Sequence, residues 1–277
     1  MNPYRFDEIG YWSEIKLDIV REYAQAYSRI LAAKPLDHFY IDGFAGAGVN
    51  LARRSKEFIP GSPLNALNVE PPFRGYFLVD LDGDKIERLR ALPEVADRSD
   101  VHVICGDCND VLLEQVFPKV KYEDYRRALC VLDPYGLHLD WEVMRAAGHM
   151  KSVEIFLNFP IMDMNRNVLW HKPQMASAAD QARMTAFWGN ESWRDAAYQH
   201  VPTLFGDHWD VKTGNPEVAE AFRQRLAAEG GFTYVSEPFP MRNSTNAIVY
   251  YLFFAAQQPI ALHIVEAIFR KYRNRMA

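Results

Sequence analysis

The segment HFYIDGFAGAG, from His38 to Gly48, joins an apolar run of strand length to a turn rich in glycine. The run ends at Asp42, and Gly46 and Gly48 follow in the turn. A glycine has no side chain, so a ligand can approach the backbone closely and the backbone can adopt a positive φ angle. Ligands of open α/β sheets bind at the carboxyl ends of the strands. The segment therefore predicts a ligand-binding turn after the first strand of an α/β sheet.

Further apolar runs of strand length follow this segment, and helical segments separate them. This alternation is typical of a doubly wound parallel sheet. Residues 49 to 60, by contrast, are interpreted as polar and irregular. We predict a Rossmann-like α/β fold, with a seven-stranded, mostly parallel sheet and helices on both faces. The strands expected after the first are residues 75–80, 101–105, 128–133, 153–159, 232–235 and 247–256.

The segments outside this alternation divide the chain into three parts. Apolar residues recur at helical spacing from Trp12 to Leu31, and Pro35 closes the pattern. After the fifth strand the alternation stops, and the sequence becomes helical in pattern and rich in Trp, Ala and Arg. We expect an N-terminal helix in residues 1–36, a core in 37–161 and 231–277, and a helical insertion in 162–230 that recognises a substrate or a partner. Tryptophans at helical spacing are more often core than ligand-binding residues.

Composition limits the classes of function. The 277 residues carry a net charge of −5, which argues against a chain that coats nucleic acid by neutralising phosphates, although an enzyme can still grip RNA or DNA locally. No apolar run reaches the roughly 18 residues of a membrane span, and no signal peptide is visible. An odd count of three cysteines suits reduced thiols, so we expect a cytoplasmic protein. The pair Cys105 and Cys108 lacks the second pair of ligands that a metal site would need.

Carboxylates follow the ends of the next predicted strands. Asp80 ends the second strand, Asp82 comes two residues later, and Asp107 and Asp133 follow the third and fourth strands. A carboxylate in the place of Asp80 can accept hydrogen bonds from both ribose hydroxyls of an adenosine, and Asp107 can accept one from an exocyclic amino group. An aspartate at a strand end also often caps the next helix. Aspartates on successive strands nevertheless predict one shared cleft.

The glycine turn resembles motif I of SAM-dependent methyltransferases that act on nucleic-acid bases, D-x-F-x-G-x-G. Its glycines run G-x-x-G-x-G, which differs from the G-x-G-x-x-G of dinucleotide-binding proteins and argues against NAD. The resemblance implies that the Rossmann-like fold is of the SAM-methyltransferase type, with S-adenosylmethionine (SAM) as the cofactor. The residues expected to bind it are Asp42, Gly43, Phe44, Gly46, Gly48, Asp80, Asp82 and Asp107.

The fourth strand is followed by Asp133-Pro134-Tyr135-Gly136. This motif is similar to the D-P-P-Y of amino methyltransferases and closer to the D-P-F-G of tRNA guanine N2 dimethyltransferases, although the second proline of D-P-P-Y is absent. The resemblance implies that Asp133 and the Pro134 carbonyl orient an amino group while the Tyr135 ring stacks on a base. A base inside a duplex would have to be flipped out to reach the ring. The expected reaction is methyl transfer to an exocyclic amino group of a nucleic-acid base.

The chain also resembles the three-Cys-motif partner (TcmP) family over nearly its full length. This resemblance implies a methyltransferase-like fold and a radical-SAM-like partner protein that carries the three-cysteine motif, and it implies substrate contacts from Asn158, Asn165 and Arg166. Lys16 is either a surface residue or, by analogy alone, a ligand of the cofactor carboxylate. The matching pieces are Trp12-Ser13 with Lys16, Asp42 to Gly48, Gly61 to Leu64, Asp133 to Gly136, Asn158-Phe159 with Asn165-Arg166, and Tyr250 to Leu252.

Two other functions remain open at this point. One is a catalytically silent subunit with a SAM-binding fold that works by binding the three-Cys partner. The other is a methyltransferase for a small molecule or a protein, which the acidic net charge favours.

Overall fold

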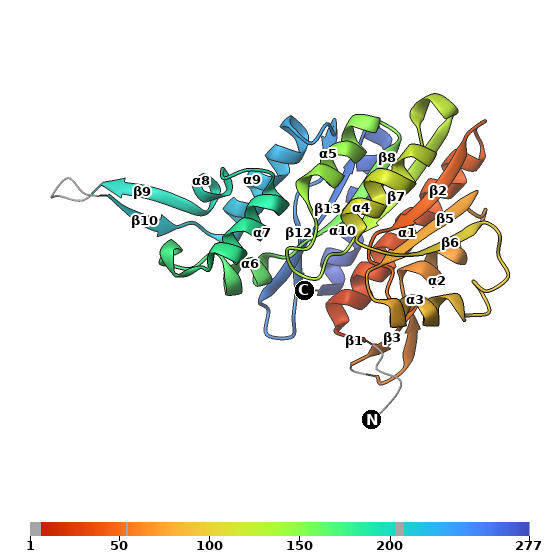
Figure 1. Cartoon of the computed structure of the whole chain (residues 1–277), viewed down its shortest axis with the longest axis horizontal. Helices are drawn as coiled ribbons and strands as arrows, with labels where there is room; N and C mark the ends of the chain where they lie inside the picture. Colours follow the sequence, from red (N-terminus) through yellow and green to blue (C-terminus); the bar gives the residue numbers. More distant parts are fainter. Residues whose placement is uncertain (1–6, 54, 203–207, 277) are drawn as a thin grey trace.

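The computed structural model describes residues 7–53, 55–202 and 208–276, and its centre is a mixed sheet (Figure 1). Within these residues the sheet contains eight strands in the order β11-β13-β8-β7-β2-β5-β6, and β12 also pairs with β13. The strands are β2 (Asp37–Asp42), β5 (Gly75–Asp80), β6 (Val101–Cys105), β7 (Arg126–Leu132), β8 (Val153–Phe159), β11 (Tyr234–Val235), β12 (Phe239–Arg242) and β13 (Ile248–Ala256).

Five consecutive strands are parallel, and the strands beyond β8 are antiparallel. β6, β5, β2, β7 and β8 run parallel, in an order that places the first strand of the chain's α/β core in the middle, as in Rossmann-like sheets. β13 is antiparallel to β8, and β11 and β12 are both antiparallel to β13. The prediction of seven mostly parallel strands is therefore corrected to eight strands in a mixed sheet.

The additional strand, β12, arises because the segment that pairs with β13 along this edge is interrupted. Between β11 and β12, the hydroxyl of Ser236 accepts a hydrogen bond from the backbone N–H of Phe254, at 3.0 Å, in place of a backbone carbonyl. Pro238 lies in the same gap and has no N–H to donate. One edge therefore pairs with β13 as two short strands.

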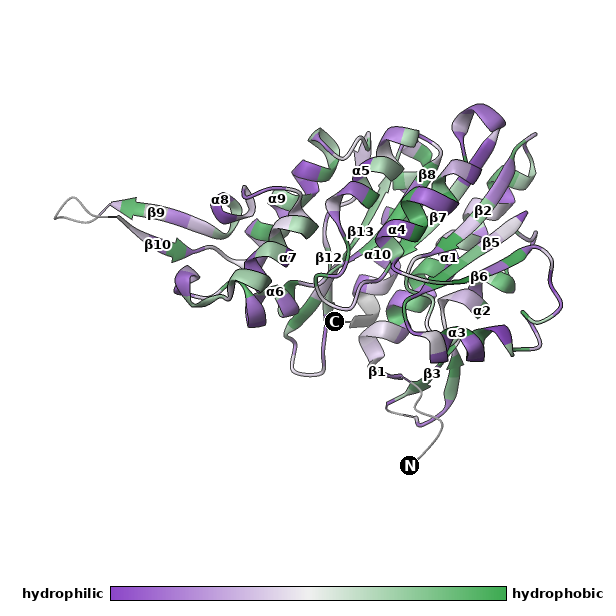
Figure 2. Cartoon of the chain, in the orientation of Figure 1, coloured by the Kyte–Doolittle hydropathy of each residue, from purple (hydrophilic) through white to green (hydrophobic). Residues whose placement is uncertain are grey.

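Helices cover both faces of the sheet, as predicted, and each face has its own core. β5 is buried along its whole length, which explains its continuous apolar sequence, and the sheet strands are hydrophobic over much of their length (Figure 2). One face packs against α1 (Tyr11–Ala32), α2 (Ser62–Leu67), α3 (Gly83–Arg90) and α10 (Pro259–Met276). The other packs against α4 (Cys108–Val111), α5 (Trp141–Met150), α7 (Ala178–Trp188) and α9 (Asn215–Ala228). Short 3-10 or π turns lie at η1 (Leu112–Val116), η2 (Phe117–Lys119), η3 (Tyr122–Asp124) and η4 (Pro173–Met175).

The first helix runs along the sheet from one end of the strands to the other. Near its start, Lys16 bonds to Asp133, which directly follows β7. Two turns later, Tyr23 bonds to Glu154 near the start of β8. α1 therefore contributes side chains to both ends of the sheet.

The segment between β8 and β11 contains helices and a two-stranded hairpin. α6 (Ile161–Asn167), α7, α8 (Trp193–Ala197) and α9 are joined there by β9 (Tyr198–Pro202) and β10 (His208–Lys212), which extend away from the body (Figure 1). The hairpin differs from the expected all-helical pattern. Trp188 and Trp193 are buried, as expected of core tryptophans, whereas Trp209 on the hairpin is 65% exposed.

A second, small sheet contains most of the segment that follows the glycine turn. It consists of β1 (Glu8–Ile9), β3 (Val49–Ala52) and β4 (Phe58–Pro60), so the interpretation of residues 49–60 as irregular is wrong. These strands are two to four residues long and pair with each other, which leaves little periodicity to detect in the sequence. No helix in the described ranges is both long and apolar enough to span a bilayer.

Candidate active site

Asp42 lies beneath the glycine turn and supports it. Its side chain is fully buried, where it accepts hydrogen bonds from the Tyr40 hydroxyl (3.3 Å) and the Phe44 backbone N–H (3.2 Å). Burial raises the pKa of Asp42 to about 6, although hydrogen bonds from Ser62 and Phe44 oppose the shift. Asp42 lines neither of the cavities described below, so its observed contacts are with the protein.

The two glycines of the turn have different surroundings. Both adopt positive φ angles, 62° at Gly46 and 78° at Gly48. A Cβ atom at Gly48 would lie 2.7 Å from Leu92 and 2.8 Å from Leu89, so this glycine allows the turn to pack against α3. A Cβ at Gly46 would meet no atom within 4 Å. Of the two, Gly46 faces open space.

Asp80 fastens the turn to the end of β5. Its Oδ2 accepts the Gly46 N–H at 2.8 Å and its Oδ1 accepts the Asp82 N–H at 2.9 Å. The Ala45 N–H donates to the Val79 carbonyl beside it, at 2.8 Å. Each carboxylate oxygen has a second lone pair. Asp80 can therefore hold the turn and still accept hydrogen bonds from a ligand.

Asp82 and Asp107 cap the helices that follow their strands. Asp82 accepts from the N–H groups of Asp84 (2.9 Å) and Lys85 (3.3 Å), and Asp107 accepts from the N–H of Asn109 (2.8 Å). The capping role that the sequence also allowed is thus present at both positions. Asp107 lines a cavity together with Asp80, whereas Asp82 does not.

Two cavities open at the carboxyl ends of the strands, and Phe44 and Tyr135 line both. The first, the Asp107 cavity, measures about 330 Å³. The second, the Asp133 cavity, measures about 210 Å³ and includes Gly46. The predicted single cleft is therefore two adjoining cavities. Besides the shared rings, the Asp107 cavity is lined by Gly43, Asp80, Leu81, Asp107, Cys108, Asn109, Leu137, His138, Asp140, Arg183 and Ala186.

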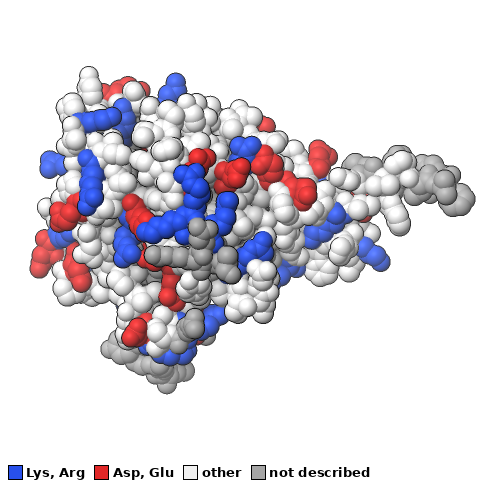
Figure 3. Space-filling model, turned by 180° about the vertical axis from the view of Figure 1, so that it is seen from behind, with Lys and Arg blue, Asp and Glu red and all other residues white. Residues whose placement is uncertain are grey.

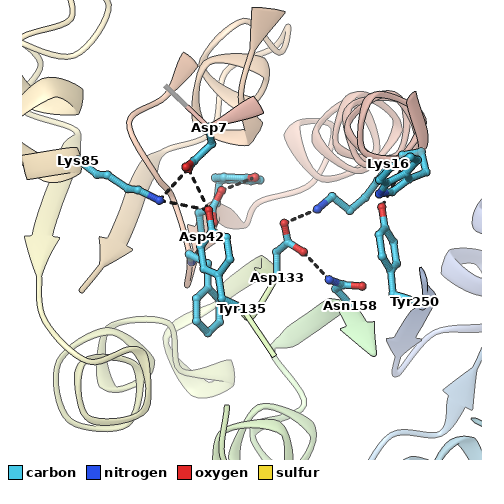
Figure 4. A network of polar contacts seen from close by, with 11 residues as sticks. Asp7, Lys16, Asp42, Lys85, Asp133, Tyr135, Asn158 and Tyr250 are labelled. Atoms are coloured by element: carbon cyan, nitrogen blue, oxygen red, sulfur yellow. Dashed lines mark hydrogen bonds and ion pairs between the residues drawn. The ribbon is translucent and has the colours of Figure 1, made fainter. Parts of the chain in front are cut away.

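Asp133 is held by two side chains from distant parts of the chain (Figure 4). Its Oδ1 accepts a hydrogen bond from Asn158 Nδ2 at 2.8 Å, and its Oδ2 forms an ion pair with Lys16. The Lys16 ammonium also lies 5.5 Å from the centre of the Tyr250 ring. The role of Lys16 could have been suspected from its spacing to Val20 and Tyr23, which places a lysine on the buried face of the helix.

Asn158 has one polar atom without a partner. Its Nδ2 donates to Asp133, but its Oδ1 is buried and accepts no hydrogen bond. Asn158 lines the Asp133 cavity. Buried acceptors are nearly always satisfied in folded proteins, so this oxygen is suited to accept a hydrogen bond from a ligand.

Tyr135 lines both cavities, and its hydroxyl takes part in a polar network with Asp7 and Lys85 (Figure 4). The hydroxyl donates to Asp7 at 3.0 Å, and the Lys85 ammonium donates to both Asp7 (2.7 Å) and Tyr135 (3.2 Å). Tyr135 as a whole residue nevertheless remains 61% exposed. Sequence analysis missed Asp7 and Lys85, because nothing local distinguishes them from other surface charges. Pro134 lines the Asp133 cavity, and Gly136 packs against Asp163.

The other two predicted substrate residues lie elsewhere. Asn165 donates to the Ile161 carbonyl and to Asn215 Oδ1, both at 2.9 Å, and accepts from Lys212 at 2.6 Å. These bonds join α6 to α9 and β10. Arg166 is exposed on α6. Neither residue lines the Asp107 or the Asp133 cavity.

Comparison with known proteins gives only distant structural likeness. No protein-family model and no curated protein sequence matches the chain. Protein LPL1258 of Legionella pneumophila (family DUF519) is 11% identical, with 92% of this chain and 91% of that chain covered and a TM-score of 0.48. The N-terminal domain of EvdMO1 with SAH bound is 12% identical, with 86% of this chain and 81% of that chain covered and a TM-score of 0.43. YcgJ of Bacillus subtilis is 14% identical, with 85% of this chain and 98% of that chain covered and a TM-score of 0.35. Membership of the TcmP family stays a prediction.

Proposed function

We propose that this chain is a SAM-dependent methyltransferase that transfers a methyl group to an exocyclic amino group of a nucleic-acid base. One observation carries the proposal: two adjoining cavities at the carboxyl ends of the strands share Phe44 and Tyr135. One cavity holds the carboxylates of Asp80 and Asp107, and the other holds Asp133. A two-substrate transfer needs such a pair of neighbouring sites.

The Asp107 cavity suits an adenosine. Asp80 retains lone pairs for ribose hydroxyls, and Asp107 provides an acceptor for an amino group. Leu81, which is 70% exposed, and Phe44 both line this cavity. A base bound there would remove this apolar surface from water, which favours binding by about 25 cal/mol per Å².

Gly46 belongs to the second cavity and faces open space, so a bound molecule can approach the turn closely there. In the proposal, the methionine part of SAM lies along this turn. SAM supplies an electrophilic methyl group on a sulfonium. The residues of the chain then need only to orient the acceptor and exclude water.

Asp133 and Asn158 are placed to orient the acceptor. Asp133 forms an ion pair with Lys16, and its carboxylate accepts hydrogen bonds and donates none. The orphan Oδ1 of Asn158 offers a second acceptor. An amino group that donates to these oxygens has its lone pair free to attack, and Asp133 lies within reach of the proton that the methylated nitrogen must lose.

The exposed Tyr135 ring can stack on a base that has left its helix. Lys and Arg gather near the middle of one face of the molecule, bordered by Asp and Glu (Figure 3), so any grip on phosphates from this face is local. This agrees with the acidic net charge of −5.

The test has two stages. Calorimetry with SAM is expected to show saturable binding; no binding at near-millimolar SAM would remove the enzymatic function and leave the silent subunit that binds a three-Cys partner. Transfer of labelled methyl from SAM to total RNA and total DNA is then compared for the wild type, Asp133→Ala and Asp84→Ala. Asp84 is an exposed carboxylate of α3 and serves as the matched control.

We expect Asp84→Ala to retain transfer and Asp133→Ala to lose at least 100-fold. Equal incorporation by wild type and Asp133→Ala would contradict the acceptor role. SAM binding without transfer to either nucleic acid, but with transfer to a protein or a small molecule in a cell extract, would contradict the nucleic-acid substrate alone.

A further inference from the structure

A third cavity lies at the amino end of the sheet, away from the candidate active site. This Glu154 pocket measures about 280 Å³ and lies between α1, β8 and α10. Glu154 is the second residue of β8, whereas Asn158 of the Asp133 cavity is four residues further along the strand, about 13 Å away. Nothing in the proposed methyl transfer uses this pocket.

The floor of the pocket has unmet hydrogen-bonding capacity. Tyr27 and Ser152 are 5% and 2% exposed, and the hydroxyl of each is buried without a partner. Glu154 accepts one bond, from Tyr23 at 2.5 Å. Leaving a buried polar group without a hydrogen-bond partner destabilises the folded protein. Tyr27 and Ser152 both line the pocket together with Glu154, so a molecule bound there would have two hydroxyls and one carboxylate as hydrogen-bonding partners.

The rim of the pocket is basic. Lys34, Arg127 and Lys151 line it, and among the described residues none of the three forms an ion pair with a carboxylate. Arg127 instead stacks on the Tyr122 ring, 3.7 Å from its centre. The Arg127 Nη1 also donates to the Arg126 carbonyl at 2.6 Å. Cations without a carboxylate partner at the mouth of a pocket attract an anionic group such as a phosphate.

Floor and rim together define the ligand. It has an anionic end for the rim, a flat apolar middle for the tyrosine and aliphatic walls, and a hydrogen-bond-donating end for Glu154. A guanine nucleotide combines these properties, since the N1–H and amino group of guanine are adjacent donors. A volume of about 280 Å³ is near the lower limit of ligand pockets and suits a mononucleotide. We propose that the Glu154 pocket binds a guanine nucleotide, with the base toward Glu154 and the phosphate at the basic rim.

The test uses GMP and the full chain. Calorimetry is expected to show saturable binding that Glu154→Gln weakens at least about tenfold, because the new amide places a donor against the donors of guanine. Lys151→Met is expected to weaken GMP about three- to tenfold and to leave guanosine, which has no phosphate, unchanged. Lys56→Met removes an exposed lysine of the small sheet and serves as the charge-matched control. Hydrogen exchange with GMP should protect residues 23–36 and 151–155.

Three results would overturn the inference: no saturable GMP binding up to 5 mM (about 3 kcal/mol of binding free energy), binding unaffected by both substitutions, or displacement of GMP by SAM. Displacement would place GMP in the Asp107 cavity. SAM binding is measured on the same samples, so failure of this inference is distinguished from failure of the proposed methyl transfer.

Discussion

The ammonium of Lys16 on α1 forms an ion pair with Asp133, which lies 117 residues later in the chain at the end of β7. The Lys16 side chain is 11% exposed and that of Asp133 33%. The N-terminal helix is therefore part of the candidate active site and does more than cover the sheet. Its removal would leave Asp133 with Asn158 as its one observed side-chain partner.

Breaking this ion pair should destabilise the protein. Lys16→Met leaves a carboxylate in a partly buried site without its cation, so we expect the free energy of unfolding to fall by about 1–3 kcal/mol. Lys16→Met combined with Asp133→Asn should recover part of that loss. Urea unfolding of the wild type, both single variants and the double variant gives the coupling energy. A coupling energy of zero would show that the pair contributes nothing to stability.

The two glycines should respond differently to alanine. Gly48→Ala places a methyl group against Leu89 and Leu92 and is expected to cost about 2–4 kcal/mol of stability. Gly46→Ala meets no atom and costs only its positive φ, about 1 kcal/mol. Its methyl group enters the space proposed for SAM, so SAM affinity should fall at least tenfold. Unchanged SAM affinity in a folded Gly46→Ala variant would remove SAM from that space.

Asp80 and Asp82 form a second matched pair. Asp80→Ala removes the acceptor that holds Gly46, and we expect SAM affinity to fall about 30-fold or more. Asp82→Ala removes the cap of α3 and should cost about 1 kcal/mol of stability with little change in SAM affinity. Calorimetry and thermal unfolding measure the two effects. A greater loss of affinity in Asp82→Ala would reverse the roles assigned to the two carboxylates.

Asp42 should make stability depend on pH. Burial raises its pKa in the folded protein to about 6 from 3.8, so the folded state binds more protons than the unfolded state between these values. The free energy of unfolding therefore falls as pH rises from 4 to 7, by about 2–3 kcal/mol from this group.

Asp42→Asn lacks this titration. The stability of the variant relative to the wild type should rise by that amount over the same range of pH, as measured by urea unfolding at each pH. A constant difference between the two proteins would show that Asp42 titrates in the folded protein as it does in the unfolded chain.

The local sequence determined most strands of the sheet and the aspartates at their carboxyl ends. The runs 75–80, 101–105 and 153–159 are strands with the predicted bounds, because a short apolar run between turn residues favours a strand. The same sequence placed Asp80, Asp107 and Asp133 at strand ends, and parallel strands bring these ends to one edge. It also marked the turn at Gly46 and Gly48 as a point where the backbone needs glycine.

Only the tertiary structure decided which of these groups face a cavity. Asp42 and Gly48 belong to the same motif as Gly46, yet one is buried beneath the turn and the other packs against α3. Three further features emerged only from the fold. They are the ion pair between Lys16 and Asp133, the hydrogen bonds among Asp7, Lys85 and Tyr135, and the division of one edge into β11 and β12. Each depends on contacts between residues far apart in the chain, and the local periodicity of a sequence does not predict such contacts.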